Sequence, residues 1–266
     1  MTPQATESPA WTEQDLADNP HAAADKARRV EAMFSAIAPS YDLNNRLHSM
    51  WRDQAWRKAA VKLADVKPTD VVADIACGTG DLSMAFEAAG AQRVIGIDFT
   101  VEMLRVAKAK LSGENSGQPT RYHAGDAMRL PLADSSADVI SIAFGIRNVA
   151  QPERAMAEFY RVLRPGGRVI VLEFSLPKNP VMRGLYNFYF KHIMPRTASL
   201  IARDKSGAYK YLPRSVNTFI DRAGMIAMIQ GAGLSDITVK SLTFGIAVVY
   251  RGVKSENAPK KSFHPG

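Results

Sequence analysis

Short apolar runs alternate with amphipathic stretches along most of the chain. Five runs of strand length recur, at 71–76, 93–97, 120–123, 139–143 and 169–174. Between them, apolar side chains recur at helical spacing over 81–89, 101–111 and 153–163, and Pro165-Gly166-Gly167 closes the last of these helices. A helix over 216–231 and two strand-like runs, 237–242 and 246–250, complete the pattern. Strands that alternate with helices predict βαβ units and a doubly wound α/β sheet.

The segments around this alternating pattern differ in composition. Residues 1–25 are polar and rich in Ala, Pro and acids, which predicts a disordered leader. Helical spacing over 26–63 predicts a helical lid, and the aromatic and basic stretch 178–215 reads as an insert. The segment 254–266, KSENAPKKSFHPG, is predicted to be a disordered tail. We therefore expect one folded domain, from 26 to 253.

Charge and cysteine content narrow the classes of function. The chain of 266 residues has 34 basic and 26 acidic residues, a net charge of +8. Such a surplus suits nucleic acid, an anionic membrane or an anionic ligand. The sequence shows no dense Lys/Arg block with interleaved aromatics, so binding to nucleic acid is the least favoured of the three. The single cysteine, Cys77, and five scattered histidines predict neither disulfides nor a metal site. Neither a signal peptide nor a membrane span is evident, so we expect a cytoplasmic protein.

The first chemical motif is "VVADIACGTGDL", in which a strand and a Gly-x-Gly turn precede a helix. Gly78 and Gly80 allow the backbone to bend tightly and to approach a ligand. Asp98 ends the next strand, 20 residues after Gly78, where a carboxylate can accept both hydroxyls of a ribose. The motif therefore predicts a nucleoside site.

Two nucleoside classes use this arrangement. Dinucleotide-binding dehydrogenases require a third glycine, but Ser83 occupies that position here. Asp81 at the helix start would repel a pyrophosphate and suits a cationic, phosphate-free nucleoside. S-adenosylmethionine is therefore the favoured cofactor, and a dehydrogenase is the weaker alternative.

A further acid follows the short third strand in "AGDAMRLP". The carboxyl ends of the strands in a doubly wound sheet converge on one crevice. Asp126 can therefore accept the adenine amino group, while Ala127 offers its backbone N–H to a ring nitrogen. Taken alone, Asp126 would more often be a turn or cap residue.

Longer motifs carry a family resemblance. The segments "DIACGTGDL", "GIDFTVEML", "AGDAMRLPLADSSADVI" and "RVLRPGGRVIVLEFS" resemble the successive motifs of the class I methyltransferases. More narrowly, "FSAIAPSYDLNNRLHSMWRDQAWR", "FGIRNV", "PGGRVIVLEFS" and "YKYLPRSV" resemble the quinone C-methyltransferases of menaquinone and ubiquinone biosynthesis, the UbiE/MenG/Coq5 family. The resemblance extends from about Val30 to Gly252.

This resemblance has implications for fold and site. It implies a Rossmann-like sheet of seven strands with an antiparallel last strand. It implies a cofactor-binding role for Thr79, Asp98, Asp126 and Ala127. It places Tyr41 over the acceptor ring, although Tyr41 would also serve simply to cap the helix after Pro39.

The segment "FGIRN", which contains Arg147 and Asn148, directly follows the buried strand 139–143. Methyl transfer to a quinol carbon is assisted by a base or by groups that stabilise the developing phenolate. Because an arginine stays protonated, we expect Arg147 to act electrostatically, with Asn148 beside it on the acceptor side. The alternative is that Arg147 pairs with an acid such as Glu173.

The predicted insert, 178–215, suggests how the protein gains access to an apolar substrate. Its aromatic cluster is consistent with a helix that covers the core, an interfacial helix or a wall for a long apolar substrate. A polyprenyl quinol resides in the bilayer, so we expect peripheral contact with the inner face of the membrane, aided by the basic surplus.

The function that we expect is S-adenosylmethionine-dependent C-methylation of a polyprenyl quinol. Demethylmenaquinol is the favoured substrate, and 2-polyprenyl-6-methoxy-1,4-benzoquinol is the alternative. Methylation of another small molecule or sterol would use the same fold. A non-catalytic subunit that binds the cofactor is a further alternative, and a homodimer or a quinone-biosynthesis complex stays open.

Overall fold

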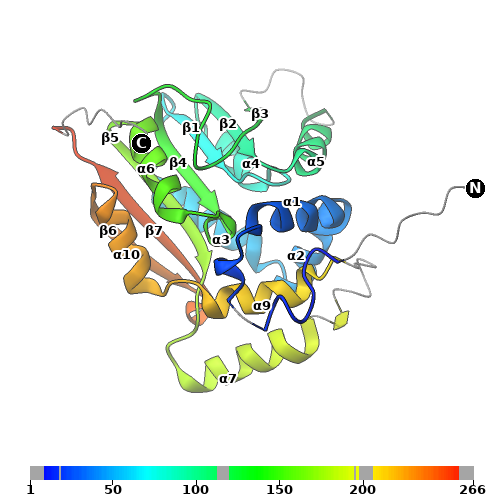
Figure 1. Ribbon diagram of the computed structural model, residues 1–266. Helices are drawn as coiled ribbons and strands as arrows, with labels where there is room; N and C mark the ends of the chain where they lie inside the picture. The colour runs from blue at the N-terminus through cyan, green and yellow to red at the C-terminus, as the bar shows by residue number, and fades with distance from the viewer. Residues whose placement is uncertain (1–8, 18, 113–119, 195, 198–205, 258–266) are drawn as a thin grey trace, which may run out of the picture.

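A seven-stranded sheet forms the centre of the molecule (Figure 1). The computed structural model describes residues 9–17, 19–112, 120–194, 196–197 and 206–257. The strands are β1 (Val71–Ile75), β2 (Arg93–Asp98), β3 (Thr120–Ala124), β4 (Ala137–Ala143), β5 (Leu163–Phe174), β6 (Leu234–Leu242) and β7 (Ala247–Lys254). They are ordered β3-β2-β1-β4-β5-β7-β6, with β7 antiparallel to both neighbours. The predicted fold class is confirmed.

Helices cover both faces of the sheet. One core contains side chains of α6 (Pro152–Val162) and α10 (Arg222–Gly231), and the other contains side chains of α3 (Arg52–Ala64) and α4 (Asp81–Ala88). A fifth helix, α5 (Val101–Ser112), packs beside β3. Because successive strand residues point to opposite faces, the continuous apolar run of β4 supplies both cores.

The order of the strands creates a crevice beside β1. From β1 the chain moves outward to β2 and β3, then returns to β4 on the other side of β1. The β1–β4 pair is parallel, with Ile75 opposite Ile142 at its end. Ligands of doubly wound sheets bind at the carboxyl ends of the strands where the order reverses.

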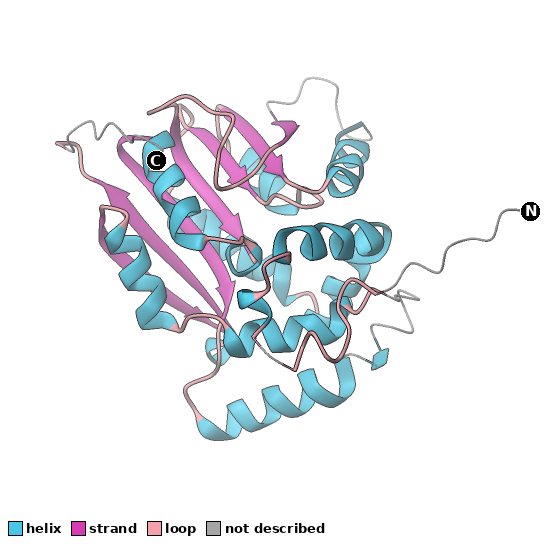
Figure 2. Cartoon of the chain, in the orientation of Figure 1, coloured by secondary structure: helices cyan, strands magenta, loops and turns pink. Residues whose placement is uncertain are grey.

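A layer of helices lies beyond the carboxyl end of β4 (Figure 2). It comprises α1 (Lys26–Ile37), α2 (Tyr41–Ser49), α7 (Pro180–Phe188) and α9 (Ala208–Thr218), with the short helices η1 (Pro20–Ala22) and η2 (Ala38–Ser40). The π-helix η4 (Tyr189–Ile193) continues α7. A third apolar cluster, which includes Met33, Ile37, Met194 and Tyr211, holds this layer together. The lid and the insert thus form one helical cover.

Two predicted boundaries were wrong. The helix expected over 216–231 is two helices, because Phe219 is extended and the Asp221 side chain caps α10 by accepting from the Gly224 N–H. The segment Pro165-Gly166-Gly167 lies inside β5 and does not follow a helix as a turn. Strand β5 begins early because Leu163 already pairs with Ala137, and the register then shifts before Val139.

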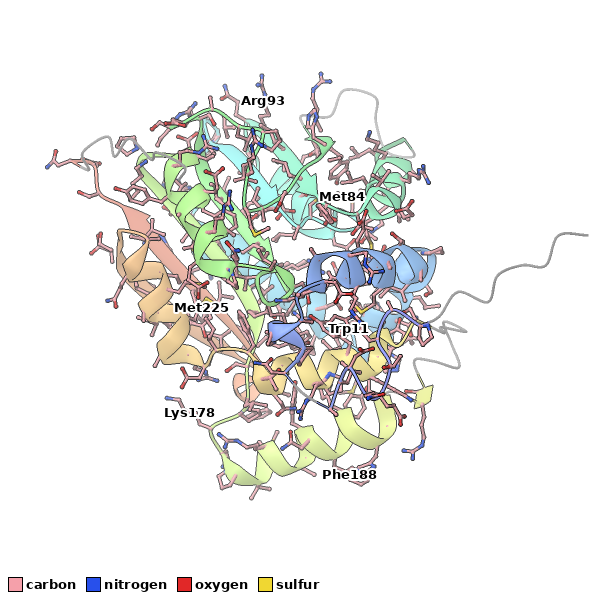
Figure 3. All side chains as sticks on the ribbon, in the orientation of Figure 1. Trp11, Met84, Arg93, Lys178, Phe188 and Met225 are labelled. Carbon is pink, nitrogen blue, oxygen red and sulfur yellow. The ribbon has the colours of Figure 1, made fainter. Side chains whose placement is uncertain are left out.

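The start of the described chain also departs from expectation. Trp11 is 2% exposed and stacks on Tyr211, with ring centroids 4.7 Å apart. Figure 3 shows Trp11 among the helices of the lid. Residues 9–17 and 19–25 therefore pack on the domain, because Trp11 finds an aromatic partner there; the rest of the expected leader, 1–8 and 18, lies outside the described residues.

The other end of the domain is close to the predicted boundary. Lys254 still belongs to β7, and its ammonium donates to the carbonyls of Tyr160 and Leu163 at 2.8 and 2.7 Å. Residues 258–266 of the expected tail, and the expected loop 113–119, lie outside the described residues. None of the described helices has the length and apolar character needed to cross a bilayer.

Candidate active site

The turn between β1 and α4 is held in an unusual backbone conformation. Gly78 and Gly80 have φ of +56° and +84°. A Cβ on Gly80 would lie 2.1 Å from the Tyr122 hydroxyl oxygen, so a side chain there is excluded. A Cβ on Gly78 would meet no atom within 4 Å, so this backbone faces open space that a ligand can occupy.

Asp98 lies next to that space, at the end of β2. It is 8% exposed, and its two carboxylate oxygens accept from the Gly78 N–H at 2.7 Å and the Thr100 N–H at 2.8 Å. Burial raises the pKa of Asp98, and these backbone donors oppose the rise. A carboxylate oxygen can accept more than one hydrogen bond, so Asp98 is able to accept ligand hydroxyls beside these donors.

Gly78 and Asp98 open onto what we call the cofactor cavity, of about 830 Å³ including its mouth. Asp126 and Ala127 line it from the loop after β3, and one Asp126 oxygen accepts from the Met128 N–H at 2.8 Å. The structure therefore brings four of the predicted cofactor residues to one cavity.

Thr79 and Asp81 point elsewhere. The Thr79 hydroxyl donates to Asp42 of α2 at 2.6 Å, and Thr79 is not among the residues lining the cofactor cavity. Asp81 pairs with Lys110 at 2.7 Å and with Arg46 at 3.3 Å. The Asp81 carboxylate, which we expected to select a cationic ligand, instead holds the lid onto the sheet domain. A cofactor contact of Thr79 stays a prediction.

Arg147 and Asn148 stabilise a strained turn at the end of β4. Phe144 adopts the left-handed region, with φ of +57°, which costs a non-glycine residue about 1–2 kcal/mol. Its carbonyl accepts from Arg147 Nη1 at 2.7 Å and from Asn148 Nδ2 at 3.2 Å. The two polar side chains that leave the strand therefore hold its last turn in shape.

Arg147 is also paired with an acid. Its Nη1 donates to Glu173 Oε1 at 2.6 Å, with side chains 6% and 2% exposed. Burial raises the pKa of Glu173, and the guanidinium opposes this rise. The alternative that Arg147 pairs with Glu173 is confirmed. Its Nε has no hydrogen-bond partner among the described residues.

Asn148 connects this turn to the insert. Its Oδ1 accepts from the Tyr211 hydroxyl at 3.0 Å, and Tyr211 stacks on Trp11. Burial raises the pKa of Tyr211 to about 12, so this hydroxyl stays a donor at neutral pH. The segment "YKYLPRSV" thus contributes a residue that fixes the orientation of Asn148.

A second cavity lies between the lid, the insert and the turn. This acceptor cavity is about 860 Å³ including its mouth, and Arg147 lines it. Asn148, which we expected beside Arg147 on the acceptor side, lines the cofactor cavity instead, because its side chain turns back to the Phe144 carbonyl and to Tyr211. Phe34, Tyr41 and Phe144 line both cavities. Burial raises the pKa of Tyr41, and the nearby Arg57 charge opposes this. Tyr41 therefore stands at the boundary between the two cavities.

Comparison with known proteins places this site in a family. The family model described as "ubiE/COQ5 methyltransferase family" matches residues 22–254. The chain belongs to the ubiE/COQ5 methyltransferase family. It is 40% identical over 232 residues to "Ubiquinone/menaquinone biosynthesis C-methyltransferase UbiE" of Geotalea daltonii, covering 86% of this chain and 98% of the relative.

Other relatives agree. The chain is 43% identical over 221 residues to "Demethylmenaquinone methyltransferase" of Thermus thermophilus, covering 83% of this chain and 99% of the relative. Among solved structures, Haemonchus contortus phosphoethanolamine N-methyltransferase 2 in complex with S-adenosyl-L-methionine has a TM-score of 0.57 at 16% identity, covering 77% of this chain and 53% of that chain. At that identity the likeness shows the fold alone.

Next to the site of this methyltransferase lies a buried acid that lines neither cavity. Asp74 is 1% exposed and accepts from the Ser83 hydroxyl at 2.6 Å and the Ser141 hydroxyl at 2.7 Å. Burial raises the pKa of Asp74 to about 6. Between about pH 4, the ordinary value, and pH 6 the folded chain therefore binds more protons than the unfolded chain.

We expect Asp74→Asn to remove this pH dependence. Because the folded-state pKa is raised, Asp74 makes the free energy of unfolding fall as pH rises from 4 to 6, by about 3 kcal/mol for two units. Denaturant unfolding at several pH values measures this. The variant should gain stability relative to the wild type over that window and hold the gain above it. A difference that does not change with pH contradicts the assignment; Asp236→Asn, at an exposed position, is the matched control.

Sequence reasoning missed some residues of the methyltransferase site. Arg57 of α3 lines the acceptor cavity. Lys26 lines neither cavity, but it is 2% exposed and donates at 2.6 Å to the carbonyl of Val149, which lines the cofactor cavity; burial lowers the pKa of Lys26 to about 8. A single Arg or Lys in a basic, helical sequence carries no local signal of burial, so only the packing of the lid reveals them.

Proposed function

We propose that this chain transfers the methyl group of S-adenosylmethionine to a ring carbon of demethylmenaquinol and so forms menaquinol. Membership of the ubiE/COQ5 methyltransferase family and the relative named "Demethylmenaquinone methyltransferase" support this proposal. The observation that carries it is the pair of cavities, which share Phe34, Tyr41 and Phe144. Donor and acceptor can thus meet where the two cavities adjoin, beside these three side chains.

The cofactor cavity fits S-adenosylmethionine. The exposed backbone at Gly78 leaves room for a ligand, the Asp98 carboxylate can accept the ribose hydroxyls, and Asp126 with Ala127 suits the adenine edge. When bound, this cofactor supplies a methyl group whose bonding electron pair stays on sulfur. The chain contributes orientation, because a methyl transfer needs the acceptor carbon about 3 Å away and in line.

The acceptor cavity fits an aromatic ring with a long apolar tail, because aromatic and aliphatic side chains supply most of its lining. For the reaction, a quinol hydroxyl loses its proton, the ring carbon takes the methyl, and the proton on that carbon leaves while the oxygen regains a proton. One C–H bond is replaced by C–CH₃ and one proton is released overall. Arg147 on the acceptor side and Asn148 on the cofactor side flank this position, with Tyr41 between them.

The experiment is methyl transfer with purified protein. Methyl-labelled S-adenosylmethionine is incubated with reduced demethylmenaquinone and, separately, with the reduced benzoquinol precursor of ubiquinone, and the lipids are separated. We expect label in menaquinol. Label only in the benzoquinol product would replace the substrate with that of the ubiquinone branch, which the name of the Geotalea daltonii relative includes.

A scaffold that only binds the cofactor gives a different result. Label in neither quinol, together with retained binding of S-adenosylhomocysteine, would overturn the catalytic proposal and favour the non-catalytic reading. Label in a water-soluble acceptor with no dependence on a prenyl tail would favour another small-molecule substrate.

Peripheral contact with the membrane is part of the proposal. Helix α7 has two faces: Tyr186 is 4% exposed, whereas Val181, Leu185 and Phe188 are 69%, 60% and 59% exposed. Figure 3 shows Phe188 at the outer edge of the molecule. Phe190, just after α7, lines the acceptor cavity. The helix therefore joins an exposed apolar stripe to the cavity that receives a bilayer substrate.

We expect Leu185→Glu to weaken binding to anionic lipid vesicles at least about 10-fold, because an apolar side chain at the interface becomes a charge that anionic lipids repel. Co-sedimentation with vesicles measures it. Val239→Glu, an equal change at a 38% exposed apolar position on β6, is the control and should bind like the wild type. Equal binding by the Leu185 variant would rule α7 out as the contact.

A further inference from the structure

Arg57 is a buried cation for which the described residues provide no direct ion pair. It lies on α3, is 7% exposed, and lines the acceptor cavity. Its Nε is buried with no hydrogen-bond partner, and no ion pair within 4 Å involves its guanidinium among the described residues. A buried, unpaired charge is costly to a fold. The cavity next to it is therefore where its partner belongs.

Among the described residues, no carboxylate forms a direct ion pair with Arg57. Asp53, one helical turn earlier, also lines the cavity, and its two oxygens accept from Ser49 and Gln54 at 2.8 and 2.9 Å. Burial acts to raise the pKa of Asp81, and the charge of Arg57 acts against this rise without a direct contact. The guanidinium instead lies over the Phe144 ring, 5.7 Å from its centroid. This ring holds Arg57 at the boundary of the two cavities, since Phe144 lines both.

Arg57 and Arg147 differ in charge balance. Arg147 donates to Glu173, so the pair is close to neutral. Arg57 has no hydrogen-bonded carboxylate within the described part of the chain. A quinol that gives up a hydroxyl proton becomes a phenolate, so the reaction requires a positive group that stabilises the negative charge on this oxygen. The Arg57 guanidinium lines the acceptor cavity and keeps a free donor for this anion.

We propose that Arg57 binds the phenolate oxygen of the acceptor and stabilises its negative charge during methyl transfer. The inference rests on the proposed function, because it assumes a quinol in the acceptor cavity. It assigns to Arg57 the electrostatic role that the sequence suggested for Arg147, and leaves Arg147 to hold the turn that shapes the cavity.

Ligand binding tests this without turnover. Two probes share a naphthoquinone ring: 2-hydroxy-1,4-naphthoquinone, an anion at pH 7, and 2-methyl-1,4-naphthoquinone, which is neutral. Calorimetry gives the Kd of each for the wild type, Arg57→Gln and Arg57→Lys. We expect Arg57→Gln to weaken anion binding at least about 10-fold and neutral binding less than about 3-fold. Arg57→Lys should keep most of the preference for the anion.

Controls separate this role from a structural one. Arg52→Gln, the same change at an exposed position of α3, should bind both probes like the wild type. Unchanged affinity for S-adenosylhomocysteine verifies the fold of each variant. If Arg57→Gln weakens both probes equally, or neither, the inference is overturned.

The two proposals fail in different ways. Wild-type protein that binds neither probe and methylates no quinol overturns the proposed acceptor, and this inference with it. Wild-type protein that methylates demethylmenaquinol while Arg57→Gln retains the preference for the anion overturns the role of Arg57 alone.

Discussion

Asp98→Asn should weaken the binding of S-adenosylhomocysteine at least about 100-fold, because a charge-assisted pair of hydroxyl contacts is worth about 3 kcal/mol or more. Both oxygens of Asp98 already accept backbone N–H groups, from Gly78 and Thr100. An amide in this place directs its NH₂ group at one of these donors. The single remaining oxygen then serves the other donor and has to accept both ribose hydroxyls.

Titration calorimetry measures this affinity directly. Asp236→Asn, the same change at an exposed position, is the control for the loss of one negative charge. A thermal unfolding midpoint close to that of the wild type shows that the Gly78 turn persists. Affinity within about 3-fold of the wild type would show that Asp98 supports the loop and does not bind the nucleoside.

Breaking the Arg147–Glu173 pair on one side should cost about 3–5 kcal/mol of stability, because it leaves a buried charge without its partner. Arg147→Met and Glu173→Gln each do so. The double variant removes both charges together, so we expect it to recover about 1–3 kcal/mol relative to the sum of the single variants. Denaturant unfolding of the four proteins gives the coupling energy.

The methyl-transfer rate of the same four proteins shows whether the pair serves only stability or also the reaction. The double variant lacks both hydrogen bonds from the Arg147 guanidinium, including the one to the strained Phe144 turn. We therefore expect stability to recover while methyl transfer stays at least about 100-fold below the wild type. Single variants that each cost less than about 1 kcal/mol, or costs that simply add, would contradict a tightly coupled buried pair.

Much of the fold follows from local sequence patterns. The strands at the centre of the sheet are continuous apolar runs, as strands buried on both faces must be, and their predicted bounds agree with β1, β2 and β4 within two residues. Boundaries without such a signal were wrong. Asp221 caps a helix inside the stretch 216–231, where apolar spacing alone suggests continuity.

Some residues of the site could likewise be predicted from the sequence, and others could not. Gly78, Asp98 and Asp126 lie at strand ends, and the carboxyl ends of the strands converge, so the sequence places them together. Arg57 and Trp11 depend on contacts between segments far apart in the chain. Trp11 meets Tyr211 only when the insert folds back over the lid, and no pattern within either segment encodes that contact.

The most direct test of the account is the structure of a ternary complex with S-adenosylhomocysteine and a short-chain demethylmenaquinol. We expect the sulfur in the cofactor cavity and the ring in the acceptor cavity, with Tyr41 beside both and the ring carbon about 3–4 Å from the place of the methyl. A ring bound outside the acceptor cavity, or turned so that the boundary of Phe34, Tyr41 and Phe144 stands between carbon and sulfur, would contradict it.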